Sequence, residues 1–477
     1  MALLDTSRLE TLTPSQFFTF TLPNPLHHDC YLRGPFLRFA VLDSPNPTTH
    51  PIVAAMIVPA HRESDWIFST ESGHRHLLFS TCSNHISRFV LIGNLLQPNS
   101  PTNIYVRPPA NPSADEEEEK RKLEMELNSL VIALHPKVCF QKGLPVPQFL
   151  TYEDNTVFRT TINTYPGTIV GEFLVEDVEV ETKPGSKKDF RRRLRFKRNP
   201  NLIQTEVRIT PTITTDGGGV RSLNLDLPSL KKMNQVVFKV DTSVLIPSYL
   251  NAMVSAIFLN ALHLDSRIQS GAAPRVLCLG VGGGALLSFL NTRLGFQVVG
   301  VDCDRIVVAV AMQFFGLKNV GDSINIIDGD AVKLIEMVAY RLRQQNTLDL
   351  QVHVGWLDSK FDVLMVDLDA SDPRYGICAP PPNFVTEPVF QTARSILTDH
   401  GIFVMNVVPL NQGFYSTLLQ QLKSVFHKVY EMDVENEDNK VLVATLSPLP
   451  SHDHYNALSN KLKQVISEAY IDSIKEV

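Results

Sequence analysis

The stretch Arg275–Asp302, RVLCLGVGGGALLSFLNTRLGFQVVGVD, decides the fold of this sequence. The apolar run Arg275–Leu279 predicts a strand, glycines crowd residues 280–284, and a helical apolar pattern leads to a second strand over Gln297–Val301. Glycine adopts backbone conformations closed to other residues and leaves room for a nucleoside to approach the amides at a helix N-terminus. Asp302 follows about 20 residues past the glycines, where a carboxylate holds a ribose diol.

Three interpretations of this glycine turn are open when it is taken alone. Gly280, Gly282 and Ala285 fit the pattern of dinucleotide-binding proteins, and Gly280, Gly282 and Gly284 fit that of S-adenosylmethionine-binding proteins. A glycine turn without a ligand is the third. The segments downstream have to decide between them.

Acidic residues follow the next two predicted strands as well. Ile324–Ile327 leads into Asp328 and Gly329, where the carboxylate can accept the adenine amino group and the amide can meet a ring nitrogen. Phe361–Val366 leads into Asp367. Open α/β sheets bind ligands at the carboxyl ends of their strands, so these acids predict one binding edge.

The end of the sheet separates the two ligand classes. After a predicted strand at Gly401–Val407 and a helix at Phe414–Phe426, the strands Lys428–Val434 and Lys440–Leu446 are joined by a short polar turn and must be antiparallel. A parallel sheet that finishes in such a hairpin is typical of class I methyltransferases. We therefore predict an α/β fold of this Rossmann-like class, with a seven-stranded sheet ending in an antiparallel hairpin and a β-rich region before it.

The chain is expected to divide into three parts. Residues 1–112 alternate short apolar runs with turns and predict a β-rich module. Residues 113–240 begin with a helix after an acidic run and continue as strands, and residues 241–477 form the methyltransferase domain. The histidine pairs at His27–His28 and His74–His76 lack further ligands at metal-binding spacing, so no metal site is predicted.

A basic run in the middle part has two interpretations. Its members alternate with Phe190, Leu194 and Phe196, which indicates the solvent-exposed face of a strand. The alternative is a docking patch for an acidic or ribonucleoprotein partner. The run consists of Arg191, Arg192, Arg193, Arg195, Lys197 and Arg198.

Composition limits the remaining possibilities. The 477 residues carry a net charge of −6, which argues against a general nucleic-acid binder. We expect no membrane partner, because the N-terminus lacks a signal sequence and no apolar run approaches the roughly 20 residues that span a bilayer. The six scattered cysteines lack CxxC spacing, which favours reduced thiols and a cytoplasmic location.

Several motifs carry a resemblance to a known family. They are GVGGG, VDCD, IDGD and above all DLDASDPRYGICAPPPNF at Asp367–Phe384, followed by SILTDHGIFVMNVV. The chain resembles the spermidine-synthase-like methyltransferases, most closely the C-terminal half of the dual methyltransferases of elongation factor 1-alpha, which modify a lysine and the N-terminus. The resemblance implies S-adenosylmethionine as methyl donor and the α-amino group of elongation factor 1-alpha as acceptor.

Two departures from the family affect what can be carried over. The dual enzymes have a separate N-terminal methyltransferase domain for lysine, and this sequence shows no second glycine turn followed by an acid, so lysine methylation is not expected. Spermidine synthases usually have glutamate where this chain has Asp302, which keeps the carboxylate but shortens its reach.

We assign the expected site residues as follows. Asp367 is the catalytic residue, which accepts hydrogen bonds from an uncharged amine and orients its lone pair. Tyr249 is a candidate wall of the pocket, with plain packing as the alternative. Gly280, Gly282, Gly284, Asp302, Asp328, Gly329 and Asp367 are expected to bind the donor, and Tyr249, Asp369, Pro380 and Pro381 the protein acceptor.

Two other functions stay open from the residues. An aminopropyl transferase that makes polyamines would need several acids around its acceptor, and Asp367, Asp369 and Asp372 supply them only in part. A scaffold that has lost catalysis is the other, although the glycines and strand-end acids that catalysis requires are intact.

Overall fold

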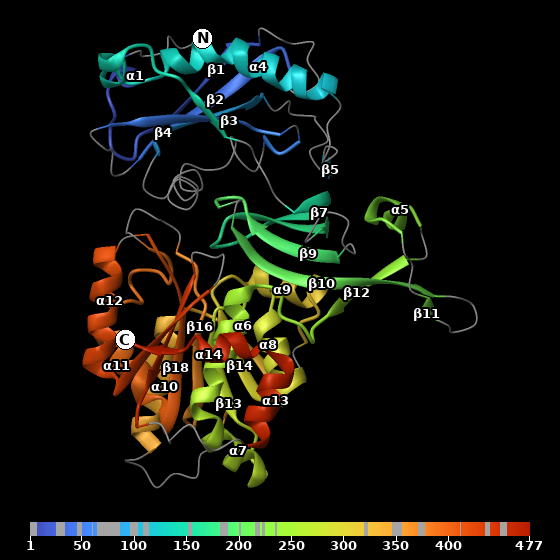
Figure 1. Cartoon of the computed structure of the whole chain (residues 1–477). Helices are drawn as coiled ribbons and strands as arrows, with labels where there is room; N and C mark the ends of the chain where they lie inside the picture. Colours follow the sequence, from blue (N-terminus) through green and yellow to red (C-terminus); the bar gives the residue numbers. More distant parts are fainter. Residues whose placement is uncertain are drawn as a thin grey trace.

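The chain folds around three β-sheets, which follow one another from top to bottom in Figure 1. This description rests on a computed structural model. It describes residues 7–24, 34–44, 50–59, 61–63, 86–95, 104–107, 114–150, 155–181, 189–199, 202–214, 220–221, 225–233, 236–318, 323–345, 355–370, 377–410, 412–434, 439–448 and 456–477. The histidines at 27, 28, 74 and 76 lie outside these ranges, as does Asp372.

The first sheet has the strand order β1-β2-β4-β3-β6 and is covered by helix α4. Its alternating apolar residues meet the apolar face of that helix, which makes a small separate core. Arg88 crosses this core fully buried, and its guanidinium donates to Asp43 and to the carbonyls of Leu9 and Leu134. The elements are α1 (Ser7–Glu10), β1 (Phe17–Pro23), β2 (Phe36–Asp43), β3 (Ile52–Ile57), β4 (Ile86–Asn94), α4 (Ala114–Ala133), the 3-10 helix η1 (Lys137–Lys142) and β6 (Gln148–Leu150).

The second sheet is a meander that lies between the first sheet and the C-terminal domain. Its strands run in the order β11-β10-β9-β8-β7-β5, and β12 pairs with β10 beside β11. The elements are β5 (Ile104–Val106), β7 (Thr156–Pro166), β8 (Glu172–Val180), β9 (Asp189–Phe196), β10 (Ile203–Thr214), β11 (Val220–Arg221), α5 (Leu227–Lys231) and β12 (Val236–Asp241).

The division expected at residue 112 does not follow these sheets. Strand β5 precedes that boundary but pairs with β7 of the second sheet, whereas α4 and β6 follow it and belong to the first. The chain therefore crosses to the second sheet and returns before it leaves the first for good. Pairing partners far along the chain decided this, and the local pattern of each strand could not reveal them.

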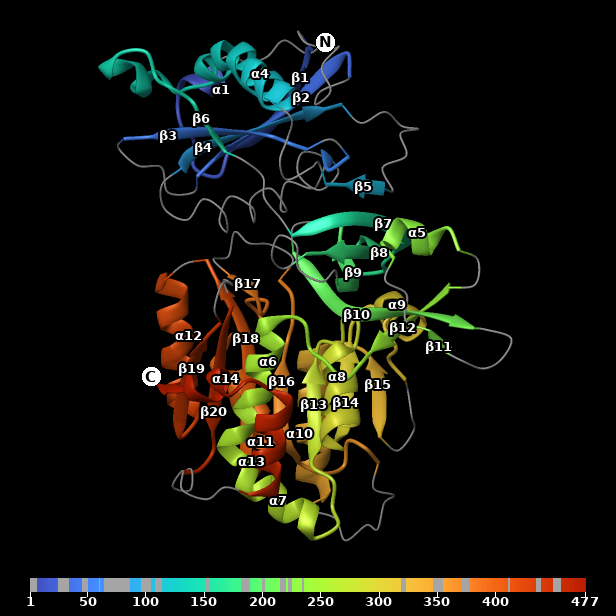
Figure 2. The same cartoon turned by 45° about the vertical axis from the view of Figure 1, so that its right-hand side comes forward.

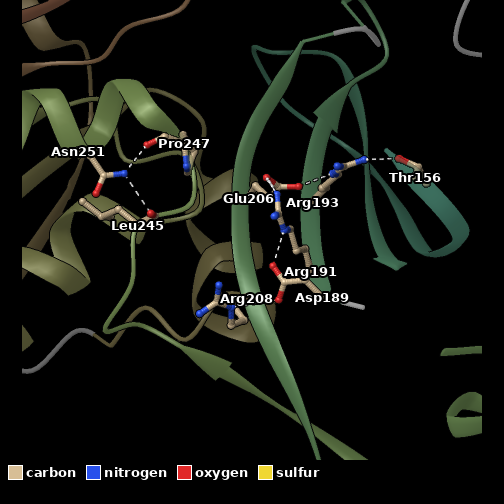
Figure 3. A network of polar contacts seen from close by, with 9 residues as sticks. All are labelled: Thr156, Asp189, Arg191, Arg193, Glu206, Arg208, Leu245, Pro247 and Asn251. Carbon is tan, nitrogen blue, oxygen red and sulfur yellow. Dashed lines mark hydrogen bonds and ion pairs between the residues drawn. The ribbon is translucent and has the colours of Figure 1, made fainter. Parts of the chain in front are cut away.

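The basic run in β9 is not a solvent-exposed face. Arg192, Arg193 and Arg195 are 9%, 8% and 5% exposed, so the expectation is wrong for these three residues. The neighbouring strands β8 and β10 carry carboxylates directly opposite Arg192 and Arg193 and diagonal to Arg195, and these form short ion pairs (Figure 3 shows Arg193 with Glu206). These three arginines are buried and paired with carboxylates of the same sheet, so they do not form a docking patch either. The pairs are Arg192–Asp177 at 2.7 Å, Arg193–Glu206 at 2.7 Å and Arg195–Glu176 at 2.8 Å.

The third sheet has the order β15-β14-β13-β16-β18-β20-β19-β21, with short β17 beside β18. Strands β13 to β16 and β18 are parallel, and β20 runs antiparallel between β18 and β19. The predicted hairpin is therefore confirmed, and the strand order is that of class I methyltransferases. Within the described ranges this sheet has nine strands instead of the predicted seven, because β17 pairs with β18, and β21 pairs with β19 beyond the hairpin. The strands are β13 (Arg275–Leu279), β14 (Gln297–Asp302), β15 (Ile324–Asp328), β16 (Phe361–Val366), β17 (Ile377–Ala379), β18 (Leu397–Pro409), β19 (Lys428–Asp433), β20 (Lys440–Thr445) and β21 (Lys475–Glu476).

Helices cover both faces of this sheet, as Figure 2 shows. One apolar core joins the sheet to the helices before β13 and at the C-terminus, and a second joins it to α10, α11 and α12. No helix in the described ranges is long and apolar enough to cross a membrane. The helical elements are α6 (Ser248–Ser255), η2 (Ala256–Asn260), α7 (Ala261–Gln269), α8 (Ala285–Phe289), the π-helix η3 (Leu290–Leu294), α9 (Arg305–Phe314), α10 (Ala331–Gln345), α11 (Glu387–Ser395), α12 (Gln412–Val425), α13 (Ala457–Val465) and α14 (Glu468–Asp472).

Asp304 fastens the second sheet to the third. Its Oδ2 accepts the amides of Ile169 and Val170, at 2.7 and 3.1 Å, in the turn between β7 and β8. Its Oδ1 accepts the amide of Ile306 at 3.0 Å and so caps α9. Around this fully buried carboxylate, apolar side chains of the second sheet form one shared core with α9, which packs on the third sheet.

We expect Asp304→Ala to lower the free energy of unfolding by about 2–4 kcal/mol, because several amides lose their acceptor in a buried place. Urea denaturation measures the loss. The control is Asp226→Ala, which removes the exposed cap of α5 and should cost about 1 kcal/mol. Equal losses in the two variants would contradict the role of Asp304 as a fastener between sheets.

Wild type and Asp304→Ala can also be compared across pH, which tests whether the carboxylate of Asp304 is charged in the folded protein. Burial alone would raise the pKa of Asp304, but the amides of Ile169, Val170 and Ile306 hold that pKa below its usual value. A carboxyl group with a lowered pKa stabilises the fold above its unfolded pKa of about 4 and loses that contribution as the pH falls. The gap between wild type and Asp304→Ala should therefore be full above about pH 5 and shrink below pH 4.

Candidate functional site

A cavity of about 1150 Å³ lies at the carboxyl ends of the parallel strands. The glycine turn and the ends of β14, β15 and β16 line it on one side, and β10 with the turn after β9 lines it on the other. Its size suits a nucleoside-bearing ligand together with part of a second molecule. The second sheet thus supplies a wall of the site, a contribution that the sequence did not reveal.

The glycine turn is shaped by contact with neighbouring backbone. Gly280 has φ +97°, and a Cβ there would lie 2.0 Å from the carbonyl oxygen of Asp367, so only glycine fits between β13 and β16. Gly282 also lines the cavity. Gly284 does not line it, because it begins α8 and packs against Leu317 instead.

The amides of the turn are already used inside the protein. Those of Val281 and Gly282 donate to Oδ2 of Asp302, each at 3.1 Å, and that of Gly283 donates to Oγ1 of Thr205 at 2.8 Å. The expected contact between a ligand and these amides is therefore not what the turn provides. Its contribution is the close approach of backbone to the cavity.

Asp302 ends β14 at the cavity wall, as the sequence predicts. Besides the two turn amides, it accepts the amide of Asp304 at 3.0 Å. A carboxylate has about four acceptor positions, so one remains for a ribose hydroxyl. Burial raises the pKa of Asp302, and the amides of Asp304, Val281 and Gly282 oppose that rise by stabilising its charge.

The acid expected after β15 is replaced by its neighbour. Asp328 is exposed and does not line the cavity, whereas Gly329 and Asp330 do. The Gly329 amide donates to the carbonyl of Asp302 at 2.9 Å, so it holds β14 and β15 together. Asp330 also accepts the amide of Lys333 at the start of α10. The sequence located the loop that lines the cavity, and the structure places Asp330 of that loop in the lining where Asp328 was expected.

Asp367 is held between two side chains at the end of β16. The hydroxyl of Tyr249 donates to Oδ2 at 3.2 Å, and Nδ2 of Asn406 donates to Oδ1 at 2.9 Å. Asn439 in turn donates to Oδ1 of Asn406 at 2.8 Å. Burial raises the pKa of Asp367, and its bonds to Asn406 and Tyr249 lower it in part. Within the described residues, no basic side chain pairs with Asp367, so the carboxylate suits a cation in the cavity.

Tyr249 reaches Asp367 because the loop before α6 is fixed. Nδ2 of Asn251 donates to the carbonyls of Leu245 and Pro247, as Figure 3 shows, which orients the first turn of that helix. Sequence reasoning included Tyr249 but missed Asn406. An amide inside the apolar strand VMNVV is the signal that could have found it, because a buried polar group needs a partner.

Asp369 is the second acid of this strand end. It forms an ion pair with Arg198, which enters the cavity from the turn after β9. Burial raises the pKa of Asp369 to about 6, the Arg198 charge opposes that rise, and the neighbouring Asp367 adds to it. Arg198 belongs to the basic run and was not expected at the site.

The proline stretch lies beside these acids, and only part of it faces the cavity. Pro381 lines it, together with Cys378 and Ala379, while Pro380 is buried and does not. The amide of Ala370 donates to the carbonyl of Cys378 at 2.8 Å, so the segment after β16 lies against β17.

Comparisons with known proteins agree with the resemblance in the motifs. The chain is 26% identical over 423 residues to "eEF1A lysine and N-terminal methyltransferase" of Homo sapiens, covering 86% of this chain and 53% of that protein. It is 26% identical over 258 residues to "Polyamine aminopropyltransferase" of Neisseria meningitidis, covering 54% of this chain and 83% of that protein. The chain thus spans about half the length of the eEF1A methyltransferases it matches.

Among solved structures, human methyltransferase-like protein 13 in complex with SAH matches with a TM-score of 0.38 and 26% identity. The match covers 46% of this chain and 92% of that one. No protein-family model matches the chain.

The raised pKa of Asp369 predicts how stability depends on pH. An acid whose folded pKa lies above its unfolded pKa stabilises the fold at low pH and loses that contribution as the pH rises through the folded value. Asp369→Asn mimics the protonated acid at every pH. We therefore expect the free energy of unfolding of the variant, relative to that of wild type, to rise by about 2–3 kcal/mol as the pH increases from about 4 to about 8. Urea denaturation across that range measures it.

The control variant should behave in the opposite way. Lys440 holds the pKa of Asp433 below its usual value through a hydrogen bond, so Asp433→Asn should lose stability relative to wild type as the pH rises. If Asp369→Asn shows no trend, or the trend of Asp433→Asn, the environment inferred for Asp369 is wrong.

Proposed function

We propose that this protein is an S-adenosylmethionine-dependent methyltransferase that methylates the α-amino group at the N-terminus of a protein such as elongation factor 1-alpha. The observation that carries the proposal is the carboxylate of Asp367. It follows β16 at the cavity, where Tyr249 and Asn406 hold it by hydrogen bonds, and it has no basic partner in the described chain. Such a group suits an amine that has to be oriented toward a reactive methyl.

The donor side of the cavity fits S-adenosylmethionine. Asp302 keeps one acceptor position for a ribose hydroxyl, and Gly329 leaves open space beside its backbone for a flat base. Gly280 lies against the backbone of Asp367, so the donor side of the cavity at the glycine turn is next to the acceptor side at Asp367. When bound, the donor supplies an electrophilic methyl on a sulfonium.

The acceptor amine attacks through its lone pair and must therefore be uncharged. An α-amino group, with a pKa near 8 against about 10.4 for lysine, already has roughly a tenth of its molecules neutral near pH 7. Asp367 accepts hydrogen bonds from the amine, while Asn406 and Tyr249 fix the carboxylate. Positioning then contributes more than a strong base would.

The relatives support a protein acceptor, since those covering most of the chain are named as methyltransferases of eEF1A. Their names include lysine methylation, but the match covers about half of their length, and we do not extend that activity to this chain. Aminopropyl transfer is supported less, because its relative matches a shorter part of the chain and Asp369 is occupied by Arg198.

We also propose a cytoplasmic location. Cys278 and Cys378 are buried free thiols, and buried thiols that stay reduced fit the reducing conditions of the cytosol.

Donor binding is tested with Asp302→Ala. The wild type should bind S-adenosylhomocysteine, and the variant should bind it about 1–3 kcal/mol more weakly, because a ribose hydroxyl loses its acceptor. Calorimetry measures both, with Asp328→Ala as the matched control that should bind like wild type, since Asp328 does not face the cavity. Binding of NAD in place of S-adenosylhomocysteine would refute the assignment.

Asp367→Asn tests the catalytic role, because it keeps the shape and an acceptor oxygen but removes the charge. We expect normal binding of S-adenosylhomocysteine and a turnover about 10 to 1000 times lower on a peptide with a free N-terminus. Transfer of labelled methyl to that peptide is the measurement. The same peptide with an acetylated N-terminus and an internal lysine should receive no label. A variant as fast as wild type would remove Asp367 from the mechanism.

A further inference from the structure

The turn after β9 brings a positive charge to the acceptor end of the cavity, by which we mean the part beside Asp367 and Asp369. Arg198 comes from the second sheet, pairs with Asp369 of the third, and lies over the ring of Phe196 at 5.1 Å. The side chains of the pair are only 21% and 17% exposed. An ion pair so enclosed is screened little by solvent, so it fixes the local charge.

Among the residues that the structure describes, five carboxylates line the cavity, and most have a structural task. Asp302 holds the amides of the glycine turn. Glu206 pairs with Arg191 and Arg193, both in β9, and Asp330 accepts an amide at the start of α10. The remaining two are Asp367, which has hydrogen-bond partners only, and Asp369, which has Arg198.

These two acids are close enough to influence one another. The charge of Asp367 adds to the rise in the pKa of Asp369. Without Arg198 the acceptor end would present two adjacent carboxylates. A linear diamine carries two ammonium groups and would pair with both. With Arg198 in place, the second position is neutral overall and contains hydrogen-bond donors.

A protein N-terminus has a different pattern of groups. It carries one amine, followed along the chain by peptide carbonyls that accept hydrogen bonds. A guanidinium has five N–H donors and can serve a carboxylate and a carbonyl together. The single amine matches Asp367, and the carbonyl after it matches Arg198.

We propose that Arg198 is a specificity-determining residue, which neutralises Asp369 and thereby selects a peptide N-terminus over a diamine as the acceptor. This inference rests on the proposed function, because it concerns the acceptor of the same site. The position of Arg198 is held from the second sheet. Thr205, in β10, accepts the amide of Gly283 at 2.8 Å, which ties the second sheet to the glycine turn beside the cavity.

The test compares two acceptors on one variant. Calorimetry at pH 8, with S-adenosylhomocysteine bound, measures the affinity of 1,4-diaminobutane and of a tripeptide with a free N-terminus. Arg198→Gln should bind the diamine about 10-fold tighter or more than wild type, and the tripeptide about 10-fold weaker, which is the effect of one charged hydrogen bond. An unchanged ratio of the two affinities would overturn the proposal.

Matched variants separate charge from damage. Arg208→Gln removes an arginine paired with Asp189, on the same sheet and outside the cavity, and should behave like wild type. Arg198→Lys keeps the charge and should keep the rejection of the diamine. In Arg198→Gln with Asp369→Asn the gain in diamine affinity should vanish, and a gain that persists contradicts the role of Asp369.

The outcomes distinguish this inference from the function itself. Wild type that binds no S-adenosylhomocysteine would refute the proposed function. Binding of S-adenosylhomocysteine by wild type and Arg198→Gln alike, with the same acceptor ratio, would refute only the role of Arg198. If Arg198→Gln fails to fold, Asp369→Asn alone decides: it removes the second carboxylate, so a diamine that binds it tighter than wild type contradicts the proposal.

Discussion

The hydrogen bonds that end on Asp302 and Asp304 are the constraint on which the rest of the site depends. Asp302 accepts the amides of the glycine turn, and Asp304 accepts those of the β7–β8 turn. The amide of Asp304 donates to Asp302, so the two carboxylates form one connected unit. Through that unit the end of β14 fixes both the glycine turn, which lines the cavity on one side, and the second sheet, which lines it on the other.

Charge compensation explains how so many ionised groups are tolerated around the cavity. The buried arginines of β9 form ion pairs with carboxylates of β8 and β10, and removing one partner from such a pair would leave an uncompensated buried charge. Arg198 extends this pattern to the next domain by pairing with Asp369. Asp367 is the exception, and its hydrogen bonds to Tyr249 and Asn406 orient its charge without neutralising it.

Much of the C-terminal domain could be predicted because its elements are written in local patterns. Strand β13 has the predicted bounds, and the glycine turn, the acid of β14 and the terminal hairpin follow from short-range signals. The second sheet was harder. The alternation of apolar and basic residues along β9 suggested a solvent-exposed face. Alternation shows only that the two faces of a strand differ, and it does not say what covers the polar one.

The sequence by itself determined the class of fold and the edge of the sheet where ligands bind, because glycines and acids at strand ends are fixed by neighbours along the chain. Only the tertiary structure decided which side chains meet there. Arg198 and Asp369 are 171 residues apart, and Thr205 and Gly283 are 78 apart. Asp330 faces the cavity where Asp328 was expected. Contacts of this kind depend on how whole sheets pack against each other, and no local pattern of residue types encodes that packing.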